Sequence, residues 1–168
     1  KGHSYKATIN NRTLRQSGCP HCSNQSSEPE IRILTELKYL FDNVVSRYKV
    51  DGIEIDVFLP EFKLGIEYDG EFWHKEKEEQ DLEKNKLLVA QNINLVRVRE
   101  KPLKALSKED VIVDKNASLL KSDLNKILKK VSAFVGIEVN QRIDSYITQS
   151  SFVNDELFKK YRSYFPSP

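Results

Sequence analysis

Acidic side chains and one histidine are spaced so that two neighbouring strands can bring them together. Asp56 interrupts the apolar run GIEIDVFLP, while Glu67 and Asp69 alternate with apolar residues in KLGIEYDG, shortly before His74. Alternation along a strand places Glu67 and Asp69 on the same face. Carboxylates gathered in this way repel one another and lose hydration, and a hard divalent cation such as Mg²⁺ or Mn²⁺ relieves both costs. With Asp56 and Glu67 as ligands, such an ion would polarise a phosphoryl oxygen and stabilise charge in a transition state.

His74 is the candidate general base of this cluster, because an imidazole exchanges protons near neutral pH. Asp81 follows seven residues later, at the expected start of a helix, where its carboxylate can fix the tautomer of the ring. The alternative interpretation is that the acids are surface positions of an edge hairpin and that His74 is one more exposed ring.

The elements that must position these groups follow an α/β order. Ser26 or Ser27 is a suitable N-cap for a helix with apolar residues at helical spacing, and Pro60-Glu61-Phe62 is typical of a tight connection between strands. The predicted elements are a helix over 26–41, strands over 52–60 and 63–70, a helix over 77–91, a strand over 94–99 and helices over 115–163. We expect the last group of helices to cover the core or to link it to a further module.

Cys19 and Cys22, the only two cysteines, form a Cys-Pro-His-Cys motif. A redox site of this type follows a buried strand and opens a helix, and neither flank fits. A zinc site needs two thiolates on a tight turn and two further ligands, of which His3 can supply one. Residues 1–27 are polar, with four basic and no acidic residues, so a bound metal would also provide the stability that they lack.

Composition excludes a membrane-spanning or disordered chain. The 168 residues are 39% hydrophobic with a net charge of +2, and no apolar run approaches the roughly 18 residues of a membrane span. No secretory signal is visible, so an intracellular location, in the cytoplasm or nucleoid, is expected. We predict three segments, over 1–26, 27–110 and 111–168, and expect them to be a piece of a longer zinc-ribbon-containing protein.

Two parts of the sequence resemble known families. Lys-Gly-His at 1–3, Asn-Arg-Thr at 11–13 and Gly-Cys-Pro-His-Cys at 18–22 resemble the second part of a treble-clef zinc ribbon that occurs in tandem arrays. This resemblance implies a structural Zn²⁺ held by His3, Cys19 and Cys22, with a fourth ligand from a cysteine before Lys1.

Residues 26–101 resemble the Vsr-like branch of the PD-(D/E)xK nuclease superfamily, which includes the very-short-patch-repair endonuclease and the EDxHD homing endonucleases. The residues that carry this resemblance are Glu28, Asp56, the run IEYDGEFWH ending at His74, Asp81, and NLVRVRE. It implies a restriction-endonuclease-like α/β core and a Mg²⁺-dependent DNA endonuclease, with Asp56 as metal ligand, His74 as base, Asp81 as its partner and Glu28 in an orienting role. Asp69 stands where the wider superfamily has a lysine, and Glu30 is the alternative to Glu28.

The resemblance implies DNA, most simply a duplex, as the partner, and the basic residues that flank the acidic cluster supply the cations that DNA binding needs. The candidate DNA contacts are Arg12, Arg15, Trp73, Lys84, Lys86, Arg97 and Arg99, with Lys101 and Lys104 nearby. Lys84 and Lys86 are equally consistent with the solvated face of a helix, and aromatic residues at this spacing are more often core. A non-cleaving binding module and a nuclease acting on RNA remain as alternative functions.

Overall fold

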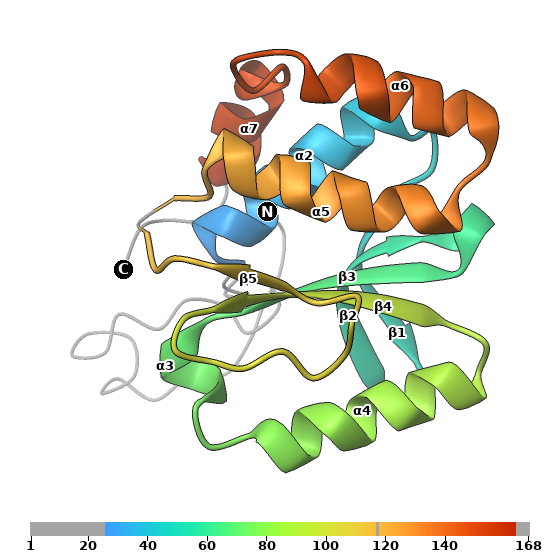
Figure 1. Cartoon of the computed structure of the whole chain (residues 1–168), viewed down its shortest axis with the longest axis vertical. Coiled ribbons are helices and arrows are strands. Elements are labelled where there is room, and N and C mark those ends of the chain that lie inside the picture. Colours follow the sequence, from blue (N-terminus) through green and yellow to red (C-terminus); the bar gives the residue numbers. More distant parts are fainter. Residues whose placement is uncertain (1–25, 117, 164–168) are drawn as a thin grey trace, which may run out of the picture.

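The computed structural model describes residues 26–116 and 118–163, which form one mixed α/β unit (Figure 1). The elements in chain order are α2 (Glu28–Leu40), β1 (Val45–Val50), β2 (Ile53–Leu59), β3 (Leu64–Asp69), α3 (Glu71–His74), α4 (Glu78–Ala90), β4 (Asn94–Glu100), β5 (Val111–Val113), α5 (Lys121–Val131), α6 (Ile137–Ile147) and α7 (Asp155–Arg162). The α/β class predicted from the sequence is confirmed.

The five strands lie in the order in which they occur in the chain. β1, β2 and β3 pair antiparallel, whereas β3, β4 and β5 pair parallel. The turn between β2 and β3 is a short 3₁₀ helix, Pro60–Phe62, which ends at Lys63 in the left-handed conformation. The two outer strands, β1 and β5, are missing from the sequence prediction. Strand β3 is thus the central strand, with an antiparallel neighbour on one side and a parallel one on the other.

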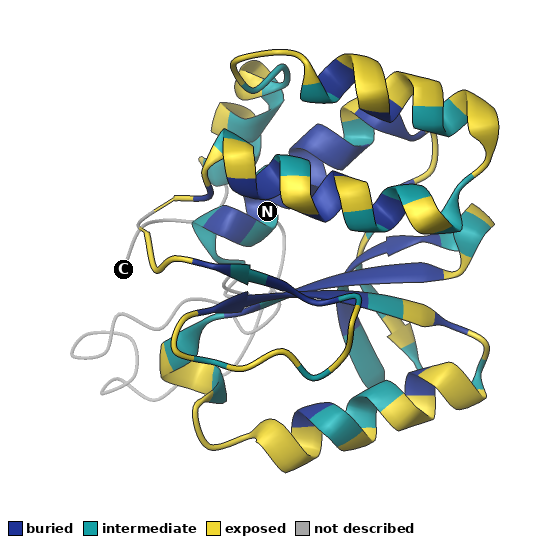
Figure 2. Ribbon diagram, in the orientation of Figure 1, coloured by how far each residue is buried: buried dark blue, intermediate teal, exposed yellow. Residues whose placement is uncertain are grey.

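Helices cover the two faces of the sheet unequally (Figure 1). α2, α5 and α6 pack on one face, where the larger hydrophobic core lies, and α4 lies across the other. α4 contributes Leu88 to a smaller core with Ile55, Phe58 and Ile93. Figure 2 shows the difference, because most of the outer surface of α4 is exposed. Polar residues of the strands lie on the side that faces α4, because Arg97 and Glu67 contact Asn85, Asp81 and Lys84 of that helix.

Residues 111–116 and 118–163 are integrated into this unit. The first of these residues form β5, which pairs with β4, and α5 buries Leu124, Ile127 and Leu128 in the larger core. The boundary predicted at residue 110 thus falls between two paired strands, and of the two roles expected for the last helices, α5 has the first, because it covers the core. None of the helices in 26–116 and 118–163 has the length and apolar character needed to traverse a bilayer.

Glu36 of α2 connects the start of this unit to its end. Its side chain is fully buried and accepts hydrogen bonds from the Tyr146 hydroxyl at 2.6 Å and from the backbone N–H groups of Val153 and Asn154, each at 3.1 Å. Arg32 also contacts this carboxylate at 3.1 Å. A buried carboxylate is tolerated when donors satisfy it in this way.

Candidate active site

Asp56 lies where the pairing of β2 with β3 ends. The ladder joins Val57–Leu59 to Leu64–Ile66, and just beyond it the Oδ2 atom of Asp56 accepts the backbone N–H of Tyr68 at 3.0 Å. A side chain thus replaces a backbone partner at this point. Burial, and to a lesser extent the nearby Asp69, raise the pKa of Asp56 above its ordinary value, although the Tyr68 hydrogen bond and Lys84 oppose this shift.

Glu30 of α2 and Asp56 line the same small cavity, of about 50 Å³. Burial in the first place, and repulsion by Asp56 in the second, raise the pKa of Glu30 to about 7. Ser27 donates its hydroxyl to Glu30 at 2.8 Å, and Arg47 lines the cavity as its cationic member. Two partly buried acids therefore face each other across a space large enough for a small ligand.

Glu28 does not join this pair. It forms an ion pair with Arg162 of α7 instead. Two residues along a helix are about 200° apart around its axis, so Glu28 and Glu30 leave α2 in nearly opposite directions. The structure therefore brings Glu30, the alternative weighed in the sequence, next to Asp56, and the orienting role expected of Glu28 does not fit its position.

Glu67 and Asp69 point from β3 toward two arginines of β4. Arg97 contacts Asp69 through two hydrogen bonds of 2.8 and 2.9 Å and contacts Glu67 at 3.0 Å, and Arg99 contacts Asp69 at 2.5 Å. Lys84 of α4 forms a further ion pair with Glu67. Burial nevertheless raises the pKa of Glu67 to about 7, since it outweighs the attraction of Arg97 and Lys84.

The positions of Arg97 and Arg99 correct the expectation that they bind DNA. Both side chains are buried, with 0% and 1% exposure, and their guanidinium groups face the acids of β3 and α4. The parallel register explains this, because it sets Glu67 beside Arg97 and Asp69 beside Arg99. The arginines neutralise an internal acidic cluster and are not available to phosphates at the surface.

Arg97→Met is expected to lower the free energy of unfolding by about 3–5 kcal/mol, because it leaves Glu67 and Asp69 buried without their main counter-charge. Urea denaturation followed by circular dichroism measures this loss. Lys86→Met, on the exposed side of α4, is the matched control and should change stability by about 0.5 kcal/mol or less. An Arg97→Met protein as stable as the wild type but weaker in DNA binding would contradict the internal role.

His74 is held between two carboxylates. Its Nδ1 atom lies 3.1 and 3.0 Å from the two oxygens of Asp81, and its Nε2 atom lies 3.7 Å from Asp69 Oδ1. Burial alone would raise the pKa of Asp81, but the His74 hydrogen bond and the charge of Arg97 outweigh it and hold this pKa below its ordinary value. An ionised Asp81 accepts the Nδ1 proton, and this assignment leaves Nε2 as the basic nitrogen.

Asp69, His74 and Asp81 each place one ligand atom within 4.8 Å of the others, a spacing that could hold a metal ion. However, Arg99 contacts both carboxylates, at 2.5 Å for Asp69 and 3.2 Å for Asp81. A cation between them would lie next to a buried guanidinium and would be repelled by it. We therefore interpret this group as a hydrogen-bonded chain that orients His74.

The exposed side of the site is aromatic. Phe72 and Trp73 of α3 are 65% and 67% exposed, and their rings meet edge to face with centroids 5.0 Å apart. The alternative interpretation of their spacing, that they are core residues, is therefore wrong. Lys86 is exposed on α4, and Lys101 is exposed at the end of β4, where it pairs with Asp114 at 2.8 Å.

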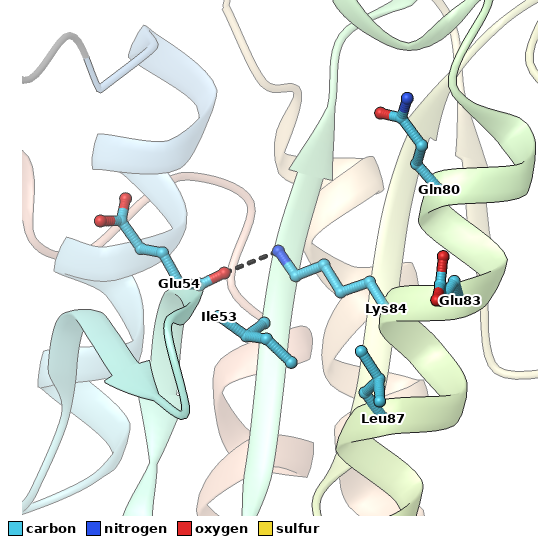
Figure 3. A pocket seen from close by; sticks show the side chains of 6 residues that line it. All are labelled: Ile53, Glu54, Gln80, Glu83, Lys84 and Leu87. Carbon is cyan, nitrogen blue, oxygen red and sulfur yellow. Dashed lines mark hydrogen bonds between the residues drawn. The ribbon is translucent and has the colours of Figure 1, made fainter.

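Lys84 points inward and not toward solvent. It crosses a groove of about 340 Å³ between β2 and α4, where its ammonium donates to the Glu54 carbonyl at 2.6 Å (Figure 3). Together with the ion pair to Glu67, this contact fixes Lys84 in the interior network. With 28% of its side chain exposed, Lys84 is not fully solvated, and its contact with a DNA phosphate stays a prediction.

Arg47 and Glu100 belong to the site region but are not among the sequence candidates. Arg47 adopts a left-handed backbone conformation, with a φ of 53°, opposite Asp56 on β1, and it pairs with Glu54 at 2.5 Å. A positive φ in a residue other than glycine has no signature in a single sequence. Glu100 is the last residue of the run NLVRVRE. Its hydrogen-bond partners belong to other elements, so the run itself does not reveal its role.

Glu30→Gln is expected to stabilise the chain at pH 8 in EDTA, by on the order of 1–3 kcal/mol, and to have less effect near pH 4. With a pKa raised from 4.5 to about 7, Glu30 keeps its proton in the folded state at pH values where the unfolded chain has released it. Stability is therefore lost as pH rises through that window, and glutamine removes the cause. Thermal unfolding between pH 4 and 8 measures the difference.

Glu28→Gln is the matched control for this experiment. It sits on the same helix but removes an ion pair with Arg162, so it should gain nothing at pH 8. Equal behaviour of the two variants would show that neither burial nor Asp56 destabilises the ionised form of Glu30.

The remaining candidates, His3, Cys19, Cys22, Arg12 and Arg15, lie outside the described residues. Residues 1–25 match the family described as "Probable Treble clef zinc finger domain", which favours zinc as the ligand of this segment. No curated protein and no solved structure matches the chain.

Proposed function

We propose that this chain is a metal-dependent DNA endonuclease with a PD-(D/E)xK core of the Vsr-like branch. The observation that carries the proposal is the pairing of His74 with Asp81 beside a group of buried and partly buried acids at the end of β3. A histidine fixed by a carboxylate is the usual arrangement of a general base. Acids whose pKa values are raised, as those of Glu30, Asp56 and Glu67 are, cluster at catalytic sites.

Asp56 and Glu30 would hold the cation. Both line one cavity and supply hard oxygen atoms, and a divalent ion such as Mg²⁺ or Mn²⁺ would relieve their mutual repulsion. Arg47 also lines this cavity, but its guanidinium is paired with Glu54 at 2.5 Å. Glu67, the second ligand expected from the sequence, fits less well because Lys84 and Arg97 already neutralise it. When bound, the ion would supply positive charge to the phosphate that is being cleaved.

His74 would take the proton of the attacking water at Nε2. Asp81 holds the ring through Nδ1, so that Nε2 is the nitrogen left to accept it. Asp69 Oδ1 lies 3.7 Å from Nε2 and would stabilise the imidazolium that forms when Nε2 takes the proton, while Arg97 and Arg99 keep the Asp69 carboxylate fixed. His74 would thus carry the proton taken from the attacking water, and the oxygen that leaves when the phosphodiester bond breaks would take its proton from solvent water.

DNA would approach the side of the sheet on which α3 is exposed. Phe72 and Trp73 project beside His74 and could stack on bases, and Lys86 could contact phosphates. The zinc-finger segment, with Arg12 and Arg15, would add backbone contacts and would hold Zn²⁺ through His3, Cys19 and Cys22.

Nicking of supercoiled plasmid DNA tests the proposal. We expect cleavage that requires added Mg²⁺ or Mn²⁺ and is absent in Asp56→Ala, and competition by duplex DNA, single strands and RNA identifies the substrate class. Tight DNA binding without cleavage would instead indicate a binding module, and preferential cleavage of RNA would replace the substrate.

A further inference from the structure

Helix α3 carries the exposed aromatic pair and the candidate base on only four residues, all of which the structure describes. None of these residues is buried, and the N-cap residue, Gly70, offers no side-chain cap. A single helical turn is not stable by itself, because nucleating a helix costs more free energy than the hydrogen bonds of one turn provide. Other parts of the molecule must therefore hold α3 in place.

Glu100, the last residue of β4, meets the first N–H group of this helix. Its Oε2 atom accepts the backbone N–H of Glu71 at 2.9 Å, and its Oε1 atom accepts the Tyr68 hydroxyl at 2.7 Å. The carboxylate is buried, with 8% exposure, so both hydrogen bonds are shielded from water. Glu100 thereby ties the start of α3 to the end of β3.

The other end of α3 is tied through His74 itself. The contact of Nδ1 with Asp81 joins the last residue of α3 to α4, whereas Lys115 contacts Glu71 at 3.2 Å in an exposed ion pair. Exposed ion pairs contribute little. Among the described residues, the less exposed side-chain contacts that fix α3 are thus those of Glu100 at its start and of Asp81 and Asp69 at its end.

We propose that Glu100 is a positioning residue for His74, acting through its hydrogen bond to the first turn of α3. This inference rests on the proposed function, in which His74 is the base. Loss of the Glu100 carboxylate frees the start of α3, so His74 keeps its bond to Asp81 but no longer presents Nε2 in one fixed orientation. The aromatic pair moves with it.

Trp73 makes this inference measurable without any activity, because it is the only tryptophan of the chain and lies on α3. In Glu100→Ala and in the milder Glu100→Asp, which shortens the side chain by one methylene, we expect a lower fluorescence anisotropy of Trp73. We also expect kcat for plasmid nicking to fall by about 10-fold or more, with KM nearly unchanged.

Glu100→Gln should restore both values to near wild type, because its carbonyl can accept from Glu71 while its amide donates to the Tyr68 oxygen. Asp114→Ala, which removes an exposed carboxylate near the same end of the sheet, is the matched control and should change neither. If Glu100→Ala fails to fold by circular dichroism, Glu100→Asp decides the question.

Unchanged anisotropy in the perturbing variants would overturn the inference, and so would lower anisotropy with unchanged kcat. A Glu100→Gln protein no better than Glu100→Ala would also overturn it, since the charge and not the hydrogen bonds would then matter. A wild-type chain that cuts nothing would overturn the proposed function, and with it the catalytic part of this inference. The anisotropy would still show whether Glu100 orders α3.

Discussion

His74→Ala is expected to lower the rate of DNA cleavage by about 10² or more while leaving DNA affinity nearly intact. Removing a general base typically costs between 10² and 10⁴ in rate. Lys86 of α4 keeps its exposed position, and the hydrogen bond from Glu71 to Glu100 still holds the start of α3, which carries the exposed Phe72 and Trp73. Single-turnover cleavage separates this chemical effect from binding, which a filter or polarisation assay measures.

Asp81→Asn provides the graded comparison for this variant. It retains a hydrogen-bonding group next to Nδ1 but no longer holds the ring by a charge, so its loss of rate should be smaller than that of His74→Ala. Unchanged turnover in His74→Ala would remove His74 from the mechanism, however well the ring is oriented.

Asp56→Asn is expected to abolish metal-dependent cleavage, with a loss of about 10² or more, without destabilising the fold. The asparagine carbonyl can still accept the Tyr68 N–H group, so the end of the β2–β3 ladder is preserved. The change also removes a partly buried charge. Burial and the nearby Asp69 raise the pKa of this carboxyl. The free energy of unfolding without metal should therefore stay equal or increase, as is common when a functional acid is neutralised.

Asp110→Asn is the matched control, because Asp110 is a buried acid with a structural role. It accepts the backbone N–H groups of Leu106 and Ser107 at 2.7 and 3.2 Å, and the Ser107 hydroxyl at 2.7 Å. The control should lose about 1–2 kcal/mol of stability and keep its cleavage activity. A strongly destabilised Asp56→Asn protein that still cuts DNA would reverse the two assignments and contradict the metal-ligand role.

The parts of the structure that depend on local pattern could be predicted from the sequence. Ser27 caps α2 as expected, and its side chain accepts the N–H of Glu30. The alternation in KLGIEYDG correctly placed Glu67 and Asp69 on one face, since both contact Arg97. The spacing of seven residues also correctly predicted the contact of His74 with Asp81, because it spans the short turn between α3 and the first turn of α4.

The parts that failed depend on how distant elements meet. In NLVRVRE the arginines alternate with valines. A strand with one solvated face has the same alternation, so the pattern does not show that the polar face of this strand is covered. Only the pairing of β3 with β4 sets Glu67 beside Arg97 and Asp69 beside Arg99. The choice between Glu28 and Glu30 likewise depends on the rotation of α2 relative to the sheet, which its own periodicity does not fix.

The contacts of Glu36 have a consequence for how the chain folds during synthesis. Its partners Tyr146, Val153 and Asn154 lie 110, 117 and 118 residues later in the chain. On a ribosome α2 therefore emerges long before the groups that satisfy its buried carboxylate, and until they arrive the cost of burying that charge opposes packing. We expect the final docking of α2 to occur after translation of α6 and of the residues that follow it, so that the first helix of this unit joins the last ones in one late step.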